Sequence, residues 1–257
     1  MVACAGPSST ICAIRSARPP ASKNAATSRI AKRLPLTASA TNPFAFEKAA
    51  RERGFNRVAG VDEVGRGPLA GPVMAAAVIL PIGFSLPVAD SKVLTARARE
   101  RLSEAILADP AVHVGLGVLD AVAVDRLNIL RATHEAMRMA LAALDVEPDF
   151  ALVDGLAVPH LPTPAEFLVK GDSRSASIAA ASIVAKVERD RYMVEQAETW
   201  PGYGFARNKG YGTREHIDAL RRLGPCPLHR RSFAPVRDSL APPPVQLELG
   251  LDSEPPL

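Results

Sequence analysis

Apolar residues in the first two thirds of the chain gather in short runs that have the length of β-strands. Residues 57–64 and 72–80 are two such runs joined by a glycine-rich turn, and residues 112–119 form a third. Two more runs, 150–153 and 166–169, are each followed within three residues by a glycine and an aspartate. Continuous apolar runs of this length are typical of buried strands. The pattern therefore predicts five strands inside the protein.

Apolar residues at helical spacing occupy much of the remaining sequence. The predicted helices cover residues 46–53, a segment that Thr95 opens, and residues 121–144, 175–199 and 213–223. In the helix after Thr95 we expect Leu102, Ile106 and Leu107 to face inward. One face of the 121–144 helix carries Leu127, Leu130, Met137 and Leu141.

Strands that come first and then alternate with helices predict an α/β protein, a mixed central sheet flanked by helices with a small C-terminal helical part. We expect residues 44–238 to form this domain. Residues 1–43 are rich in Ala, Ser, Thr, Pro and Arg and are expected to be a disordered basic extension, and residues 239–257 a disordered, Pro-rich acidic tail. The composition of the extension also suits an organelle transit peptide or a gene start placed too far upstream.

The net charge of +4 is concentrated at the start of the chain, where residues 1–43 hold six Lys/Arg and no acid. Between residues 201 and 237 there are eight basic residues and two acids, which suits a polyanionic partner or a solvated helix face. No apolar run reaches the ~20 residues of a membrane helix. Three scattered cysteines favour a reducing cytoplasm over a disulfide framework.

Four acidic residues lie at or just after the ends of predicted strands: Asp62, Glu63, Asp154 and Asp172. A lone acid in such a place is ordinarily a turn residue or a helix cap. If the four converge, carboxylates within ~4–6 Å of one another repel and raise one another's pKa unless a cation lies between them. Mg²⁺ takes oxygen ligands and keeps several waters, and two ions ~3.5–4 Å apart can activate water and stabilise the leaving oxygen of a phosphodiester.

Asp62 and Glu63 are neighbours on one strand, so their side chains should point to opposite faces of the sheet. Both residues can serve one site only through a local bulge, through their position at the strand end, or through the backbone carbonyl of Glu63. The sequence leaves these three alternatives open.

The turn after the acidic pair, Gly65-Arg66-Gly67, supplies exposed backbone N–H groups, freedom at positive φ and one guanidinium. Most Gly-x-Gly runs are simply turns. This one lacks the third glycine of a dinucleotide site and the lysine of a P-loop, which argues against a small-molecule phosphotransferase. Backbone groups this close to a nucleic acid could sense the ribose 2′-OH.

Three further residues are candidates for substrate contacts. Tyr211 lies between glycines just ahead of a helix that Thr213 caps, so it can stack on a sugar or base, or pack on its own domain. Lys92 precedes a helix and either contacts a phosphate or is a surface lysine. Lys186 lies four residues after Ser182 on one helix face, where phosphate contact and structural packing are equally open.

These motifs together resemble the ribonuclease HII family, in the family's order and over about residues 58–236. The matching runs are Asp62-Glu63-Val64-Gly65-Arg66-Gly67-Pro68-Leu69-Ala70-Gly71-Pro72, Asp90-Ser91-Lys92, Val153-Asp154-Gly155, Lys170-Gly171-Asp172, Ala180-Ala181-Ser182-Ile183-Val184-Ala185-Lys186-Val187, Arg189-Asp190, Lys209-Gly210-Tyr211-Gly212-Thr213, His229-Arg230 and Ser232-Phe233. No single motif is specific, but the set is. The basic extension and the acidic tail are departures that do not touch these motifs.

The resemblance implies a ribonuclease H-like fold and an endonuclease that cuts the RNA strand of RNA–DNA hybrids. It also implies cleavage 5′ to ribonucleotides embedded in duplex DNA, by two-metal catalysis with Mg²⁺ or Mn²⁺, leaving 3′-hydroxyl and 5′-phosphate ends. The family's metal-binding acids fall on Asp62, Glu63, Asp154 and Asp172. Its 2′-OH-reading loop falls on Gly65 to Gly67, and its junction-sensing tyrosine on Tyr211. The family is typically monomeric.

Two alternatives remain open. A non-catalytic reader of RNA–DNA junctions would keep the basic residues and Tyr211 but would not need four acids. Another nuclease of the same fold would share the acids but has no reason to carry the glycine loop and Tyr211 together. Separately, residues 246–251 loosely resemble the short peptide with which bacterial repair proteins bind the sliding clamp, although Gly250 stands where a larger residue is expected.

Overall fold

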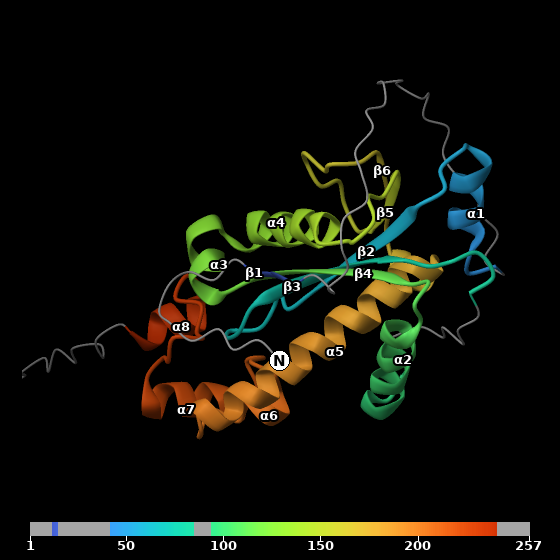
Figure 1. Cartoon of the computed structure of the whole chain (residues 1–257). Helices are drawn as coiled ribbons and strands as arrows, with labels where there is room; N and C mark the ends of the chain where they lie inside the picture. Colours follow the sequence, from blue (N-terminus) through green and yellow to red (C-terminus); the bar gives the residue numbers. More distant parts are fainter. Residues whose placement is uncertain (1–11, 15–41, 85–93, 241–257) are drawn as a thin grey trace, which may run out of the picture.

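The computed structural model describes residues 12–14, 42–84 and 94–240, and within these ranges one mixed sheet of six strands forms the centre (Figure 1). The strands are β1 (Cys12–Ile14), β2 (Val58–Val64), β3 (Val73–Ile79), β4 (His113–Leu119), β5 (Phe150–Asp154) and β6 (Ala165–Leu168). Their order is β1-β4-β3-β2-β5-β6. The pairs β2–β5 and β5–β6 are parallel, and the others are antiparallel. The five strands predicted from the sequence are confirmed.

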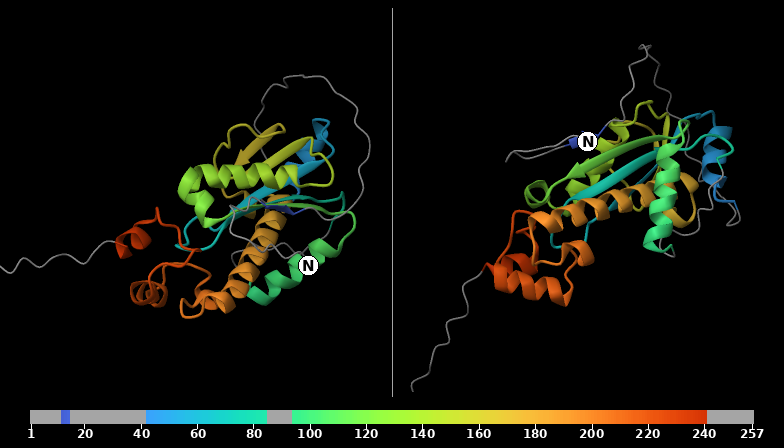
Figure 2. Two further views of the ribbon diagram at one scale, coloured as in Figure 1. Left: turned by 60° about the vertical axis from the view of Figure 1, so that its left-hand side comes forward. Right: turned by 60° about the horizontal axis from the view of Figure 1, so that its bottom comes forward.

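Helices cover both faces of the sheet, as the views in Figures 1 and 2 show. Helix α4 (Ile129–Ala142) packs on β3 and β4, whereas α5 (Ala176–Thr199) packs on β2 and β3 from the other side with α2 (Ala96–Ala108) beside it. Strand β3 alternates between them: Ala75 and Ala77 belong to the core under α4, and Ala76 and Val78 to the core under α5. A strand buried on both faces reads as one continuous apolar run.

Two glycines let these helices lie close against the sheet. A Cβ at Gly60 of β2 would overlap the main chain of Ser177 in α5, and one at Gly117 of β4 would overlap the carbonyl of Ala136 in α4. Gly60 precedes Asp62 by two residues, so the contact with α5 and the first acid share one face of β2. The close contact fixes the position of Asp62 beside α5.

The remaining helices lie around this core. They are α1 (Ala45–Glu52), α3 (Ala121–Leu127), the 3₁₀ turn η1 (Gly171–Ser173), α6 (Phe205–Asn208), α7 (Arg214–Leu223) and α8 (Ala234–Ser239). The last three form the C-terminal helical part that the sequence predicted. Thr95 and Thr213 cap α2 and α7 as expected, because each side chain accepts a hydrogen bond from the N–H three residues on.

The predicted helix over 121–144 is wrong in one respect: it is two helices, α3 and α4, separated at Asn128. Asn128 has φ 66, and its side-chain oxygen accepts a hydrogen bond from the N–H of Arg131 and so caps α4. Asparagine is found at positive φ more often than most residues other than glycine. The break changes the helical phase, and Leu130, predicted to be on the buried face, is 51% exposed.

Two other predictions differ from the structure. Leu107 was expected to face inward but is 48% exposed, because α2 buries only the narrow stripe of Ser103 and Ile106. Residues 12–14, within the predicted disordered extension, form β1 and pair with β4.

Lys92 and residues 246–251 lie outside the described residues. Within the described part of the chain, no helix has the length and apolarity to cross a membrane.

Candidate active site

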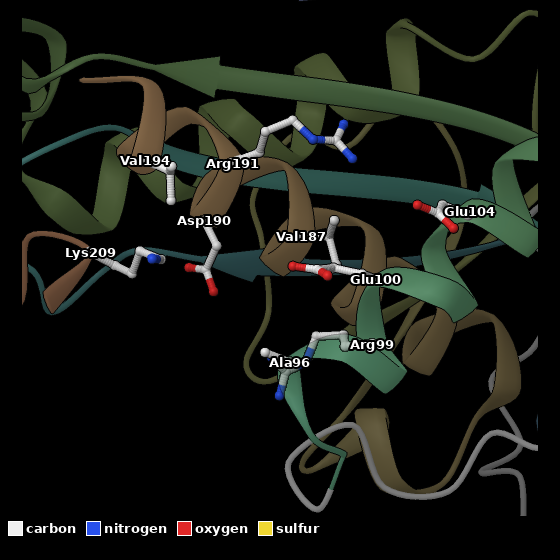
Figure 3. Close-up of a pocket in the computed structure, with 9 residues that line it drawn as sticks. All are labelled: Ala96, Arg99, Glu100, Glu104, Val187, Asp190, Arg191, Val194 and Lys209. Atoms are coloured by element: carbon white, nitrogen blue, oxygen red, sulfur yellow. The ribbon is translucent and has the colours of Figure 1, made fainter. Parts of the chain in front are cut away.

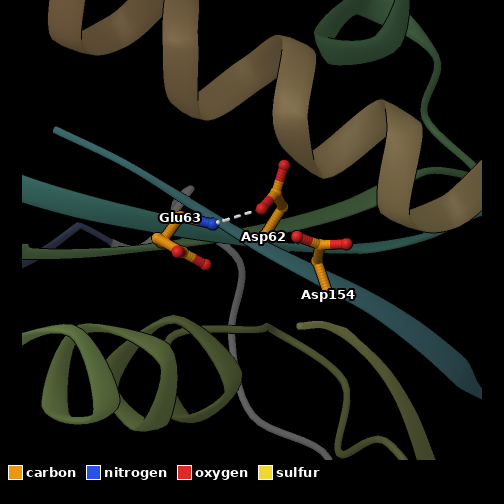
Figure 4. A group of neighbouring side chains, drawn as sticks. All are labelled: Asp62, Glu63 and Asp154. Carbon is orange, nitrogen blue, oxygen red and sulfur yellow. Dashed lines mark hydrogen bonds between the residues drawn. The ribbon is translucent and has the colours of Figure 1, made fainter. Parts of the chain in front are cut away.

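Three of the predicted acids meet at the edge of the sheet where β2 and β5 end. Asp62 and Glu63 lie near the end of β2, and Asp154 is the last residue of the parallel neighbour β5. One carboxylate oxygen from each lies within 4.8 Å of the others, and among the described residues this is the group that could hold a metal ion (Figure 4). Parallel strands end at the same edge of a sheet, which is why residues 92 positions apart converge.

The strand end resolves how both members of the Asp62–Glu63 pair reach one site. The pairing of β2 with β3 runs regularly to Val64, without a bulge, whereas its pairing with β5 stops at Val61 and Val153. Figure 4 shows Asp62 directed toward α5 and Glu63 directed away from it. The main-chain N–H of Glu63 donates to Asp62 Oδ1 over 2.7 Å and fixes the first carboxylate.

The site disfavours uncompensated negative charge. Burial raises the pKa of Asp62 well above its ordinary value, the charges of Glu63 and Asp154 add to the effect, and a hydrogen bond from Ser182 opposes it. Burial also raises the pKa of Glu63, opposed by Arg66 at 3.1 Å. A divalent cation among these oxygens would relieve the repulsion, so the residues present fit a metal site.

The fourth predicted acid, Asp172, is buried in η1 but is not part of this group of three. Its neighbour Gly171 donates its N–H to Asp154 Oδ1 over 2.6 Å, which ties the turn to the acid group. The role of Asp172 as a metal ligand stays a prediction.

Two buried arginines hold the glycine loop that follows β2. The guanidinium of Arg230 donates to the carbonyls of Gly65, Arg66, Pro68 and Gly71 over 2.6–3.0 Å. That of Arg189 donates to the carbonyls of Ala70, Pro72 and Lys209 over 3.0–3.1 Å. The loop carbonyls are therefore turned inward, while Arg66 and Gly67 remain exposed.

The sequence did not reveal this clamp. Arg230 was counted among the basic residues of a charged surface, which is wrong, because its side chain is fully buried. Burial, and then the nearby charge of Arg189, lower the pKa of Arg230 to about 9. Other members of the same set, such as Arg214 and Arg222, are exposed as expected. Only the family resemblance had singled out Arg189 and Arg230, without giving either a role.

Tyr211 lies beside the glycine loop, as the stacking hypothesis requires. A Cβ on Gly67 would lie 4.0 Å from Tyr211 Cε1, and the tyrosine is 42% exposed. Lys186 Nζ lies 5.8 Å from the centre of the Tyr211 ring and donates to Asp190 Oδ1 over 2.7 Å. The structure thus brings Tyr211 and Lys186 together next to the loop.

Comparison with known proteins identifies the family. The family model for ribonuclease HII matches residues 59–236. This chain belongs to the ribonuclease HII family. Ribonuclease HII of Rhodospirillum rubrum is 58% identical over 190 residues, 72% of this chain and 87% of that protein. Ribonuclease HII of Chlamydia trachomatis serovar A is 54% identical over 196 residues, 76% of this chain and 90% of that protein.

Solved structures confirm the ribonuclease H-like fold. Ribonuclease H2 of Pyrococcus horikoshii OT3 matches with a TM-score of 0.60 at 24% identity, covering 72% of this chain and 97% of that one. Ribonuclease HII of Archaeoglobus fulgidus, solved in a complex with PCNA, matches with a TM-score of 0.57 at 25% identity, covering 69% and 95%. Bst-RNase HIII, solved in complex with Mn²⁺, matches with a TM-score of 0.59 at 22% identity, covering 77% and 73%.

In this ribonuclease HII family member, a buried chain of hydrogen bonds supports the main chain of Tyr211. The carbonyl of Tyr211 can only accept, so His216 Nδ1 donates to it over 2.9 Å. His216 Nε2 then accepts from His229 Nε2 over 3.0 Å. His229 Nδ1 in turn accepts the N–H of Cys226 over 3.0 Å. Both rings are neutral in this arrangement, packed against Tyr203 and Phe205.

We expect acid to weaken this C-terminal part. Burial lowers the pKa of His216, and the hydrogen bond to the Tyr211 carbonyl and the charge of Glu215 oppose this effect. Burial and then the neighbouring His216 lower the pKa of His229 to about 4. A depressed histidine pKa contributes stability above the unfolded value of about 6.5, and this is lost as the pH falls toward 4, on the order of 3 kcal/mol for His229. NMR titration of the His229 ring should give a midpoint near 4. A midpoint near 6.5 in the folded protein would contradict the arrangement.

A hollow of about 410 Å³ lies between α2 and α5, and its lining does not suit a polyanion (Figure 3). Its charged lining consists of Arg99, Arg191, Lys209, Glu100, Glu104 and Asp190. Three positive and three negative side chains cancel, and no member of the acid group lines it. The hollow therefore offers a polyanion no net positive charge, and the acid group remains the candidate active site.

Proposed function

We propose that this protein is a ribonuclease H, an endonuclease that hydrolyses the RNA strand of RNA–DNA hybrids and cuts 5′ to ribonucleotides embedded in duplex DNA. The observation that carries the proposal is the meeting of Asp62, Glu63 and Asp154 within 4.8 Å in a ribonuclease HII family chain. The products would carry 3′-hydroxyl and 5′-phosphate ends, because water and not the 2′-OH attacks. Removal of ribonucleotides from DNA is the role that follows.

Asp62, Glu63 and Asp154 are proposed to hold Mg²⁺ or Mn²⁺ in a two-ion site, with Asp172 as the fourth ligand. The raised pKa values of Asp62 and Glu63 and the crowded oxygens of Asp62, Glu63 and Asp154 support this. The ions, when bound, supply positive charge that lowers the pKa of the attacking water and stabilises the leaving 3′-oxygen. Arg66, paired with Glu63, opposes the effect of burial by favouring the charged form of that carboxylate, and it orients the side chain.

The clamped glycine loop is proposed to recognise the ribonucleotide. Gly65 has φ +88, which favours glycine, and its missing side chain leaves room for the packed Arg189. Gly67 is exposed and carries no side chain that would keep a substrate away from the main chain. Main-chain groups of a rigid loop can discriminate a single 2′-hydroxyl, the group that distinguishes RNA from DNA.

Tyr211 is proposed to test the nucleotide on the 3′ side by stacking on its deoxyribose. Tyr211→Ala should reduce cleavage at RNA–DNA junctions by about tenfold, since stacking contributes about 1–3 kcal/mol, and should change cleavage of long RNA tracts less. Tyr211→Phe keeps the ring and should behave like the wild type. The ratio of junction to tract cleavage, measured for all three proteins, checks this. An unchanged ratio in Tyr211→Ala would remove the stacking role.

Cleavage of a labelled DNA duplex with one embedded ribonucleotide tests the proposed function. We expect one cut, 5′ to the ribonucleotide, with Mg²⁺ or Mn²⁺ and none with chelator. An all-DNA duplex of the same sequence is the control and should remain intact. Tight binding of the duplex without any cut would instead support the non-catalytic junction reader, and cleavage of the all-DNA duplex would support another nuclease of this fold.

We also propose that the protein acts as a monomer in the cytoplasm. Residues 246–251 are proposed to contact the sliding clamp, and the A. fulgidus relative was solved with PCNA. Loss of clamp pull-down after deletion of residues 246–257 would support this contact, and pull-down that survives the deletion would discard it.

A further inference from the structure

A cationic hollow of about 580 Å³ lies against α3 and α4, on the face of the sheet opposite α5. We call it the α3–α4 hollow. Its charged and titratable lining consists of Arg126, Arg131, His134, Glu135, Arg138 and His160. Three arginines against one glutamate give it a net positive charge, unlike the balanced hollow between α2 and α5 (Figure 3).

The arginines of this hollow differ in what they contact. Arg138 donates to Glu135 over 2.6 and 2.9 Å and to the carbonyl of Pro159 over 2.9 Å, so it holds the segment after β5 in place. Arg126 and Arg131 are exposed. Within the described residues, neither lies within ion-pair distance of a carboxylate. Their charge is therefore available to a ligand.

The α3–α4 hollow opens at the same edge of the sheet as the acid group. Leu119, the last residue of β4, lines it, and His160 belongs to the segment that follows Asp154 at the end of β5. Strands β2, β4 and β5 run in one direction, so their ends lie together.

Arg66 connects the two places. It pairs with Glu63 at 3.1 Å. Burial is the largest cause of the lowered pKa of His134 in the hollow, the charge of Arg138 is the second, and the charge of Arg66 is the third. The exposed Arg66 of the glycine loop is thus a neighbour of both the acid group and the hollow.

We propose that the α3–α4 hollow binds backbone phosphates of the nucleic-acid substrate, on the side of the cleaved bond away from Tyr211. This inference rests on the proposed function. Tyr211 neighbours Lys186 of α5, whereas the hollow lies under α4, so the glycine loop and acid group lie between them. Guanidinium groups suit phosphate oxygens. Three arginines that line a hollow at the same edge of the sheet as the acid group suit a polymer that extends past that group better than a small anion.

The double variant Arg126→Gln/Arg131→Gln tests the proposal, with Arg101→Gln as the matched control, because Arg101 is an exposed arginine of α2 on the other face. The assay is cleavage of a duplex with one embedded ribonucleotide. We expect KM to rise about tenfold with kcat unchanged, and the slope of log affinity against log salt to fall by about two, one for each lost phosphate contact. Arg101→Gln should match the wild type.

Shortening the duplex shows on which side of the cleaved bond the hollow binds. Shortening it on the 5′ side of the ribonucleotide, away from Tyr211, should erase the difference between wild type and double variant. Shortening it on the 3′ side, the side of Tyr211, should not. A double variant with wild-type KM and salt slope would overturn the inference while the proposed function stands. A wild-type protein that fails to cut any duplex would instead overturn the proposed function.

Discussion

Asp62→Asn is expected to reduce cleavage by about a thousandfold or more, equivalent to about 4 kcal/mol of transition-state stabilisation, while substrate affinity changes by only a few fold. Asp62 supplies a carboxylate oxygen to the group of three, and an amide is a weaker ligand without charge. The residues proposed to bind substrate, Gly65 to Gly67 and Tyr211, are untouched. Cleavage rates and binding affinity, measured on the same ribonucleotide-containing duplex, check both parts.

The same variant should be more stable than the wild type when metal is removed. The pKa of Asp62 is raised by burial and by Glu63 and Asp154, so above its unfolded pKa of about 3.9 the charged carboxylate costs stability. In chelator at pH 7 the Tm of Asp62→Asn should exceed that of the wild type, and the difference should vanish as the pH falls and Asp62 takes up a proton. Asp218→Asn, a change at an exposed acid of α7, is the control. A less stable or fully active Asp62→Asn would contradict the site.

Arg230→Met is expected to destabilise the protein by about 3–5 kcal/mol, the range seen when a buried charged group is removed from its partners. The guanidinium satisfies four carbonyls of the segment from Gly65 to Gly71, and methionine of similar length satisfies none. Each buried carbonyl without a donor costs free energy. Arg230→Lys should recover only part of the loss, because one ammonium cannot replace the planar fork.

Urea denaturation of Arg230→Met and Arg231→Met separates the clamp from the general effect of losing a charge. Arg231 is the next residue and is exposed, so its replacement should cost less than about 0.5 kcal/mol. Equal losses in the two variants would show that Arg230 does not clamp the loop. Cleavage should also fall in Arg230→Met at temperatures where it remains folded, because the glycine loop is no longer fixed.

The sequence was most informative where local pattern decides the structure. Apolar runs predicted the five strands, and acids at or near the ends of two of them supplied Asp62 and Asp154 as candidates, which the family resemblance assigned to one site. The two acids meet because parallel strands end at one edge. Thr95 and Thr213 were recognisable as caps from their position ahead of helical spacing. These features depend on neighbours in the chain or on one strand pairing.

What the sequence could not predict depends on distant contacts. Nothing around Arg230 distinguishes it from the exposed Arg231, since its burial comes from loop carbonyls more than 150 residues earlier. The break at Asn128 is invisible to apolar spacing, which continues across it. Gly60 looks like an unremarkable strand residue until α5 lies against it.

Anomalous diffraction from a crystal of the protein grown with Mn²⁺ tests whether the acid group holds the metal. We expect an anomalous peak directly ligated by carboxylate oxygens of Asp62, Glu63 and Asp154, with Asp172 alongside, and loss of that peak in Asp62→Asn. A Mn²⁺ peak away from these residues, with none among them at saturating Mn²⁺, would contradict it.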